Sequence, residues 1–454
     1  MVNPKNKTAQ KNEVKASNTK KMVTALIVSL CITFCLLLQV YHFTWKQTGY
    51  DFYPLWIYGQ EVSGSDVPNF YSNGFAEFVE KKYLQKALKN EDGSKFKTAA
   101  LWNTEMYEPG HLPDSTPLLY ASLATISSGD YDRDLAIFQF ASTLFFCLTI
   151  YAIGRALGNS IPTVLIAISF IFLFWSPFHS DTEVANLARM QSGILVTCIL
   201  LWRYFDNRFA FVLGGMLLGI SVLLKPNIIG VPISLAIVWF FRRRYHKLIL
   251  VIIGAFLGGL VALVYSSLYY GSLTCWLSWF QVLVDIQKNA DPMAINNLSL
   301  VCLVDHYFGI DISIAIFFGL LSSLILCCWL ARKRKAQTHI NSAASEFIED
   351  ILGVGAGLLM IFMSYKIVWG HYFLLLVPAL LALISPGEIQ NQASGKSSDI
   401  ATQLLGGVLF FIYALLPLRL LVPAASLHDI AATIGIASLM FWALLLFRLH
   451  QEII

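Results

Sequence analysis

One acidic residue stands alone in an aromatic segment close to the start of the chain. Asp51 lies within Gly49–Gly59, GYDFYPLWIYG, directly after the first long apolar run. Aromatic side chains favour the boundary between membrane and water, so the segment is predicted to lie there. A carboxylate in that position is either a solvated interfacial group or a general base at the mouth of a membrane-embedded site, where ionisable groups are often functional.

Cations that could bind an anion occur at several places further along the chain. The candidate phosphate ligands are Arg189, Lys225, Lys366, His371 and Arg419. A charge-assisted contact from such groups would offset the cost of placing a phosphate at the membrane. Polar and aromatic residues near the same span ends are candidates for substrate contacts, namely Trp56, Tyr107, Glu108, Asn186, Gln191, Asn297, Trp369 and Tyr372. Together these residue types predict a site for a lipid-linked anionic substrate.

Five of the candidates also have a structural explanation, and the sequence leaves both explanations open. Arg189 could form an ion pair with one of two nearby acids, Asp181 or Glu183. Arg419 could reach lipid phosphates, and Lys225, which precedes a proline, could bind carbonyl groups at a helix end. A solvated acid and an interfacial histidine would explain the remaining two, Glu108 and His371.

The composition places these residues in a membrane protein. Of 454 residues, 56% are hydrophobic and 13% are charged, and the mean hydropathy is +0.62. A soluble chain of this length would need more charged surface, so the prediction is an all-α polytopic membrane protein. The eight cysteines form no CxxC pair. Cys275 and Cys302 lie outside the predicted spans and could form a disulfide, and no metal site or cofactor is predicted.

Hydropathy and charge together predict the topology. Residues 1–21 carry several lysines and are predicted to be a disordered cytoplasmic tail, followed by one membrane domain over 22–454. With 22–44 as the first span there are about twelve transmembrane helices, the others being 135–154, 161–178, 190–205, 210–224, 226–241, 248–270, 312–330, 347–366, 371–385, 403–422 and 429–447. This arrangement leaves most arginines and lysines of the short loops on the cytoplasmic side, as the positive-inside rule requires.

A long external first loop is predicted over residues 45–132. Apolar residues recur at helical spacing between Phe75 and Leu88 with lysines among them, which is typical of an amphipathic helix in the interface. Residues 117–127 are apolar but too short to span at about 1.5 Å per residue, so they are predicted to be re-entrant or interfacial. Pro226 should break the helix after Lys225, which makes 210–241 a candidate helical hairpin with an external tip.

In order and spacing, these segments resemble the GT-C glycosyltransferases, and in particular the family-87 type. The similarity is carried by Asp51-Phe52 with Trp56 and Gly59, by Tyr107 to Pro117, and by Gly214 to Lys225-Pro226. It continues through Asn297-Leu298-Ser299-Leu300 and Trp369-Gly370-His371-Tyr372. Asn186 to Gln191 is similar to an Asn…Gly-Gln motif of that family, but Met190 stands where glycine is expected.

The resemblance implies a reaction. Members of that family transfer a sugar, mannose in the polyprenyl-phosphate-mannose-dependent enzymes of bacterial envelopes, from a lipid phosphate to a hydroxyl of a lipid or glycan acceptor. Transfer occurs with inversion at the external face of the membrane, and by position the general base would be Asp51. The lysines before the first span predict a cytoplasmic N-terminus, and the lack of a eukaryotic targeting signal favours a bacterial inner membrane.

Other function classes are less well supported by the residues. The chain has no Walker loop, no dinucleotide fingerprint and no DxD pair, so neither ATP nor nucleotide-sugar chemistry is predicted, and no nucleic-acid partner is expected. A transporter or flippase of a lipid-linked sugar is the alternative, because charged residues and broken helices occur in transporters as well. Against it, the two halves of the chain show no convincing repeat. An inactive scaffold subunit is a third possibility.

Overall fold

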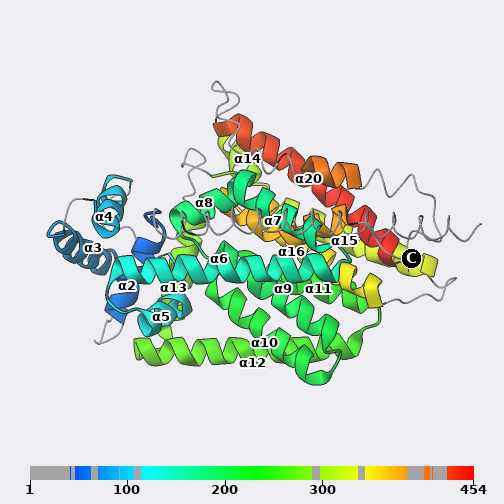
Figure 1. The fold of residues 1–454 in the computed structure, drawn as a ribbon, viewed down its shortest axis with the longest axis horizontal. Coiled ribbons are helices and arrows are strands. Elements are labelled where there is room, and N and C mark those ends of the chain that lie inside the picture. The colour runs from blue at the N-terminus through cyan, green and yellow to red at the C-terminus, as the bar shows by residue number, and fades with distance from the viewer. Residues whose placement is uncertain are drawn as a thin grey trace, which may run out of the picture.

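The protein is an assembly of helices in a computed structural model that describes residues 41, 47–62, 70–90, 93–106, 114–288, 297–335, 343–385, 403–409, 412 and 427–453. All regular elements in those ranges are helical (Figure 1). In chain order they are α2 (Phe52–Val62), α3 (Asn73–Ala87), α4 (Lys95–Met106), α5 (Pro117–Ile126), α6 (Tyr131–Ala156), α7 (Ile161–Phe174), α8 (Ser176–Val184), α9 (Ala188–Tyr204), α10 (Arg208–Leu224), the 3-10 helix η1 (Pro226–Ile228), α11 (Gly230–Phe241), α12 (Tyr245–Tyr270), α13 (Thr274–Lys288), α14 (Leu300–Phe308), α15 (Ser313–Lys335), α16 (Ala343–Ser364), the 3-10 helix η2 (Gly370–Leu376), α17 (Val377–Ile384) and α20 (Leu427–Ile453).

Five of these helices are long and apolar enough to cross a membrane, namely α6, α12, α15, α16 and α20. The pair α7 and α8, which is bent by 62°, would make a sixth. A polytopic, all-helical membrane protein is therefore supported. The number of twelve spans is not, because α10, α11 and the η2–α17 segment are apolar but shorter, and the predicted spans 22–44 and 403–422 lie wholly or largely outside the described residues.

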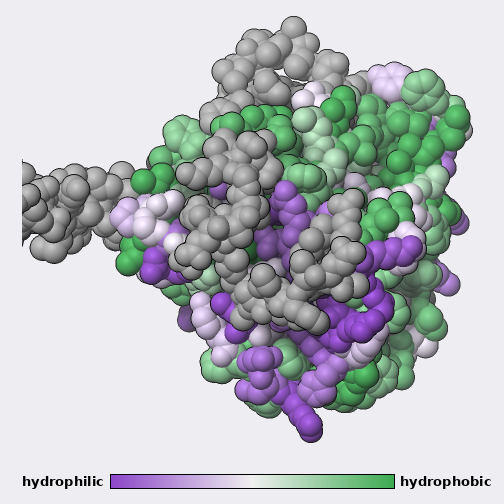
Figure 2. All heavy atoms as spheres, turned by 90° about the vertical axis from the view of Figure 1, so that its right-hand side faces the viewer, coloured by the Kyte–Doolittle hydropathy of each residue, from purple (hydrophilic) through white to green (hydrophobic). Residues whose placement is uncertain are grey.

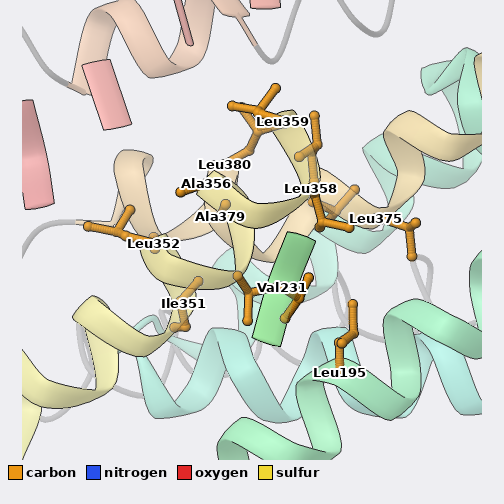
Figure 3. Close-up of a cluster of buried hydrophobic side chains, with 14 of the residues drawn as sticks. Leu195, Val231, Ile351, Leu352, Ala356, Leu358, Leu359, Leu375, Ala379 and Leu380 are labelled. Carbon is orange, nitrogen blue, oxygen red and sulfur yellow. The ribbon is translucent and has the colours of Figure 1, made fainter. Parts of the chain in front are cut away.

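The central helix of the bundle is α16, and 94% of its most apolar stretch is buried. Figure 3 shows its leucines meeting side chains of α9, α11, η2 and α17, among them Leu195, Val231, Leu375 and Leu380. The outer helices α12 and α15 are only 22% buried over the same kind of stretch. Ile252, Phe256 and Leu268 of α12 are exposed, as expected for a flank that faces lipid.

Glycines allow two helix pairs to pack at backbone distance. A Cβ added at Gly215 or Gly219 of α10 would lie 2.4 or 2.2 Å from a carbonyl oxygen of α12. Gly230 of α11 meets Gly357 of α16 in the same way, at 2.2 Å. Small residues at such contacts replace the hydrophobic driving force that lipid removes. The predicted hairpin at Lys225 is therefore a break between two helices, each of which packs on a different partner.

The first loop folds into a small helical unit around α2 (Figure 1). The predicted amphipathic helix is α3, and Val79 and Tyr83 are buried in the same apolar cluster as α2, while Phe78 is 58% exposed. Tyr83 and Lys82 donate hydrogen bonds to Glu61 of α2 at 2.8 and 2.7 Å. The helix α4 was not predicted, and the short helix α5 packs on α2 and α12.

Charged residues gather at the end of the bundle where α11 ends and where α12 and α16 begin. Figure 2 looks at this end of the molecule and shows hydrophilic side chains over part of the surface. Glu349 accepts from Arg242 at 2.8 Å and from Arg244 at 2.7 Å, and Lys247 donates to Asp350 at 2.5 Å. The sequence left a disulfide between Cys275 and Cys302 open, but both are free thiols.

Candidate functional site

Asp51 is positioned by a tight turn that docks on the end of α8. Gly49 has φ +75°, a conformation that glycine adopts without strain, and a Cβ there would also lie 2.6 Å from Leu135. The backbone N–H groups of Gly49 and Asp51 donate to the carbonyl oxygens of Glu183 and Val184 at 3.2 and 2.8 Å. The acid is thus held at the start of α2, beside the α8–α9 junction.

That junction presents the partner of Asp51. Helix α8 ends at Ala185, which has left-handed φ and ψ values of 56° and 55°. The next residue, Asn186, donates from Nδ2 to Asp51 Oδ2 at 2.6 Å. Its Oδ1 accepts from Lys225 Nζ at 2.7 Å and from the backbone N–H of Leu187 at 2.7 Å. One amide therefore joins the carboxylate to the ammonium group.

Lys225 lies at the break between α10 and η1. Its backbone is extended, with φ −156° and ψ 113°, as favoured before a proline. Two side chains satisfy carbonyls that the break leaves without helical partners: Gln191 Nε2 donates to Lys225 O at 3.1 Å and Thr116 Oγ1 donates to Leu224 O at 3.0 Å. The Nζ atom lies 4.9 Å from the ring centroid of Tyr372, a cation–π distance. The contacts given for the ammonium group are thus with neutral groups, the amide of Asn186 and the ring of Tyr372.

The 3-10 helix η2 brings His371 and Tyr372 to this cation. Both are buried, with exposed fractions of 4% and 8%, and the ring of Tyr372 stacks on Phe362 at 5.9 Å between centroids. Within the described part of the chain His371 Nε2 has no hydrogen-bond partner. The structure therefore brings together four predicted site residues, which are Asp51, Asn186, Lys225 and Tyr372, and it places His371 next to them.

Electrostatics at the site favour a carboxyl group that takes up a proton near neutral pH. Part of the Asp51 side chain reaches the surface, but the protein packed around it removes enough water to raise its pKa from 3.8 to about 6. The hydrogen bond from Asn186 and the charge of Lys225 oppose this rise, and the charge of Asp114 adds to it. Asp114 was not among the predicted residues, because nothing in its proline-rich segment marked it.

Arg189 belongs to a separate buried ion pair. Its Nε donates to Asp181 Oδ2 at 2.5 Å and its NH2 to Gln139 Oε1 at 2.5 Å, and NH1 bonds to Thr143 Oγ1. The side chains of Arg189 and Asp181 are both 0% exposed. This is the structural bridge that the sequence left open, and the carboxylate is already neutralised by the guanidinium.

Other predicted site residues lie in structural contacts. Trp56 is 1% exposed and donates to Asp134 at 2.9 Å, inside the aromatic cluster of α2. Asn297 pairs with Trp369 in an isolated antiparallel bridge and donates to Lys366 O at 3.0 Å. Lys366 Nζ is bound to Asp305 and Asp311, at 2.7 and 3.0 Å. The remaining candidates, Tyr107, Glu108 and Arg419, lie outside the described residues.

Gln191 and Asn227 hold the break between α10 and η1 by hydrogen bonds. Gln191 Nε2 donates to Asn227 Oδ1 at 3.1 Å as well as to Lys225 O. The sequence predicted Gln191 but missed Asn227, although its place directly after Lys225-Pro226 was a signal. Within the described residues no group of three or more His, Cys, Asp or Glu side chains is arranged to hold a metal ion.

The chain was compared with protein-family models, with curated proteins and with solved structures. None of them matches it. The site holds a carboxyl group with a raised pKa, which one amide joins to a cation that no carboxylate of the described residues contacts directly.

Proposed function

We propose that the protein is an integral-membrane glycosyltransferase that uses a polyprenyl-phosphate sugar, with mannose as the first candidate. The observation that carries the proposal is the Asp51–Asn186–Lys225 chain, with bonds of 2.6 and 2.7 Å. A base and an anion-binding cation a few ångströms apart suit a substrate in which an attacked carbon carries a phosphate leaving group. The resemblance to GT-C enzymes points to the same chemistry.

In the proposed reaction Asp51 removes the proton from an acceptor hydroxyl. The acceptor oxygen forms a bond to the anomeric carbon of the sugar as the bond between that carbon and the phosphate oxygen breaks. The electron pair stays with polyprenyl phosphate, and Lys225 stabilises its negative charge. His371, which lies next to Lys225, would contact the same phosphate. One displacement inverts the anomeric configuration.

Among the acids of the site Asp51 is the best candidate for the base. A base works well when its pKa lies close to the working pH, and the raised value of about 6 meets that condition. Asp181 is unsuitable because its carboxylate already binds Arg189. Asn186, which donates to Asp51, would orient the carboxylate for the acceptor.

The acceptor is proposed to be a hydroxyl of a lipid or glycan at the external face of a bacterial inner membrane. The site lies where α8, α10 and η2 meet, whereas the basic cluster of Arg242, Arg244 and Lys247 lies at the far end of α11. If that cluster marks the cytoplasmic side, the site opens on the other side.

The test is sugar transfer from labelled polyprenyl-phosphate-mannose in membranes that contain the wild type or Asp51→Asn. Asparagine keeps the shape but cannot accept the proton, so transfer should fall ~10²–10⁴-fold while donor binding remains. Asp130→Asn is the matched control, because asparagine caps α6 as well as aspartate does. Equal transfer by the wild type and Asp51→Asn would refute the proposed base.

Transport of a lipid-linked sugar is the second candidate, and one observation favours it. Two discontinuous segments adjoin the site, namely the break at Lys225 and the 62° bend between α7 and α8. Transporters place such breaks around their substrates. Movement of labelled donor across sealed vesicles by both wild type and Asp51→Asn, with no transfer by either, would favour this alternative.

A further inference from the structure

Several buried polar atoms next to Lys225 have no hydrogen-bond partner in the described part of the chain. They are Gln191 Oε1, Ser192 Oγ, Ser221 Oγ, Asn227 Nδ2 and His371 Nε2. Every one of these residues is at most 5% exposed, and three of them are at 1% or less. Buried polar groups in native proteins are nearly always satisfied, so a group of five requires an explanation.

Hydrogen bonds place Gln191 and Asn227 at the break after Lys225, and the pairing of α9 with α10 places Ser221 near them. Gln191 bonds to Asn227 and to the carbonyl of Lys225, whose N–H donates to Ser221 O at 3.2 Å. Helices α9 and α10 run antiparallel, with Cys198 bonded to Gly214. Two turns back along α9 and two turns forward along α10 from that contact set Gln191 opposite Ser221.

The chemistry of the set selects the ligand. Gln191 Oε1 only accepts a hydrogen bond, Asn227 Nδ2 only donates, and the two serine hydroxyls do both. An anion would be repelled by the amide oxygen, and a cation by the amide hydrogens. The complementary group is a neutral hydroxyl, which accepts and donates at the same atom, and it is present in water and in a sugar ring alike.

We infer that Gln191, Ser221 and Asn227, with His371 beside them, form a subsite for the hydroxyl groups of a neutral sugar. The inference rests on the proposed function and adds to it the residues that recognise the sugar ring, which would favour a hexose with free ring hydroxyls over an acidic or phosphorylated sugar. Lys225 would bind the phosphate of the donor, while the amides of Gln191 and Asn227 would form hydrogen bonds with hydroxyl groups of the sugar ring. Discrimination against a sugar that lacks the matching hydroxyl follows from the unpaired buried groups it would leave.

The experiment measures kcat/KM for polyprenyl-phosphate-mannose and for its four singly deoxygenated forms. Asn227→Asp keeps the oxygen that accepts from Gln191 and replaces the unpartnered NH2 group by a second carboxyl oxygen, which also brings a negative charge, so the uncharged variant that follows is needed beside it. Ser221→Ala removes a hydroxyl that has no partner in the described protein. The control is Ser234→Ala on α11, whose hydroxyl donates to Gly353 O at 2.6 Å, outside the site. Thermal unfolding of every variant shows whether it is folded.

In the wild type we expect one deoxygenated donor to lose ~10-fold or more in kcat/KM. With the parent donor, kcat/KM of Asn227→Asp or Ser221→Ala should fall by a similar factor. With that deoxygenated donor, kcat/KM of the variant should fall no more than about twofold further, because the contact is already absent. Ser234→Ala should respond to the deoxygenated donors as the wild type does.

If every deoxygenated donor lowers the wild type and both variants by the same factor, the atoms hold only ordered water and the subsite is refuted. A drop in the unfolding midpoint of Ser221→Ala without donor would agree with that outcome. Absence of transfer by the wild type with the parent donor would instead refute the proposed function, and the subsite with it. The wild-type rate with the parent donor therefore separates the two failures.

Discussion

The molecule has two charged clusters at opposite ends of α11, and they are built differently. Before the start of α11, Lys225 contacts the amide of Asn186 and the ring of Tyr372. Asn186 lies between Lys225 and the acid Asp51. At its end, Arg242, Arg244 and Lys247 contact the carboxylates of Glu349 and Asp350 directly. In the second cluster each cation has an anionic partner, whereas Lys225 has none in direct contact within the described residues.

Under the proposed function, this difference separates a structural role from a functional one. Buried ion pairs with complete partners hold helices in register, and an external anion would have to displace a carboxylate to bind there. A cation held by neutral groups keeps its charge available for a phosphate. By the same criterion Arg189 is structural, because Asp181 already neutralises it. The clusters should therefore respond in opposite ways to substitution.

The largest expected effect on stability is at the paired cluster. Glu349→Ala leaves Arg242 and Arg244 buried without their main partner, so unfolding should become easier by about 3–5 kcal/mol. Thermal unfolding in detergent measures this, and kcat per folded molecule should be unchanged. Glu346 is 42% exposed and lies 3.5 Å from Arg244, so Glu346→Ala should change stability by less than about 1 kcal/mol. Equal effects of the two substitutions would contradict the ranking.

The largest expected effect on activity is at the unneutralised cation. Lys225→Met keeps the length of the side chain and removes its charge, so sugar transfer should fall ~10²–10³-fold. The bond to Asn186 and the cation–π contact with Tyr372 are lost, but the cost of burying the charge is lost with them, so stability should change by about 1 kcal/mol. Lys82→Met removes an exposed ion pair with Glu61 and serves as the control. Loss of stability without loss of transfer would assign Lys225 to structure.

How much of this the sequence could predict depends on the range of the contacts. Helix positions were predictable because apolar runs and glycine or proline breaks are local: α10 ends before Pro226, as expected. The acid Asp51 was found from its aromatic surroundings. Asp51 and Lys225 are joined by Asn186, which is 135 residues from Asp51. That contact depends on how α8, α9 and α10 pack, and no local pattern in the sequence predicts it.

The same argument explains the residues that the sequence could not place. Trp56 is aromatic and near Asp51, yet it packs inward because α3 and α6 cover that face of α2. Asp114 was missed because its neighbour Thr116 bonds to Leu224 on a distant helix, and Asn227 because its partner Gln191 lies on another helix. Short polar residues carry little periodicity, so their roles emerge only from the packed helices.

The pH dependence of transfer sharpens the comparison at the site. With an Asp51 pKa of about 6 the base is protonated below that pH, so kcat/KM should rise about tenfold per pH unit up to pH 6 and then level off. The hydrogen bond from Asn186 lowers the pKa, so Asn186→Ala should move the midpoint to higher pH. A midpoint near 4 in the wild type would mean that the carboxylate is not desolvated.

The smallest effect is expected for the cation that was predicted to bind phosphate but lies between two acids. The pKa of Lys366 is raised, first by its hydrogen bond to Asp305 and then by Asp311. Both acids are partly exposed, so Lys366→Met should change stability by about 1 kcal/mol or less and leave transfer within about twofold of the wild type. The same substitution at Lys225 differs only in whether a carboxylate is the partner. If Lys366→Met lowers transfer as much as Lys225→Met does, then carboxylate pairing does not separate structural from functional cations in this protein, and Lys366 returns to the list of phosphate ligands.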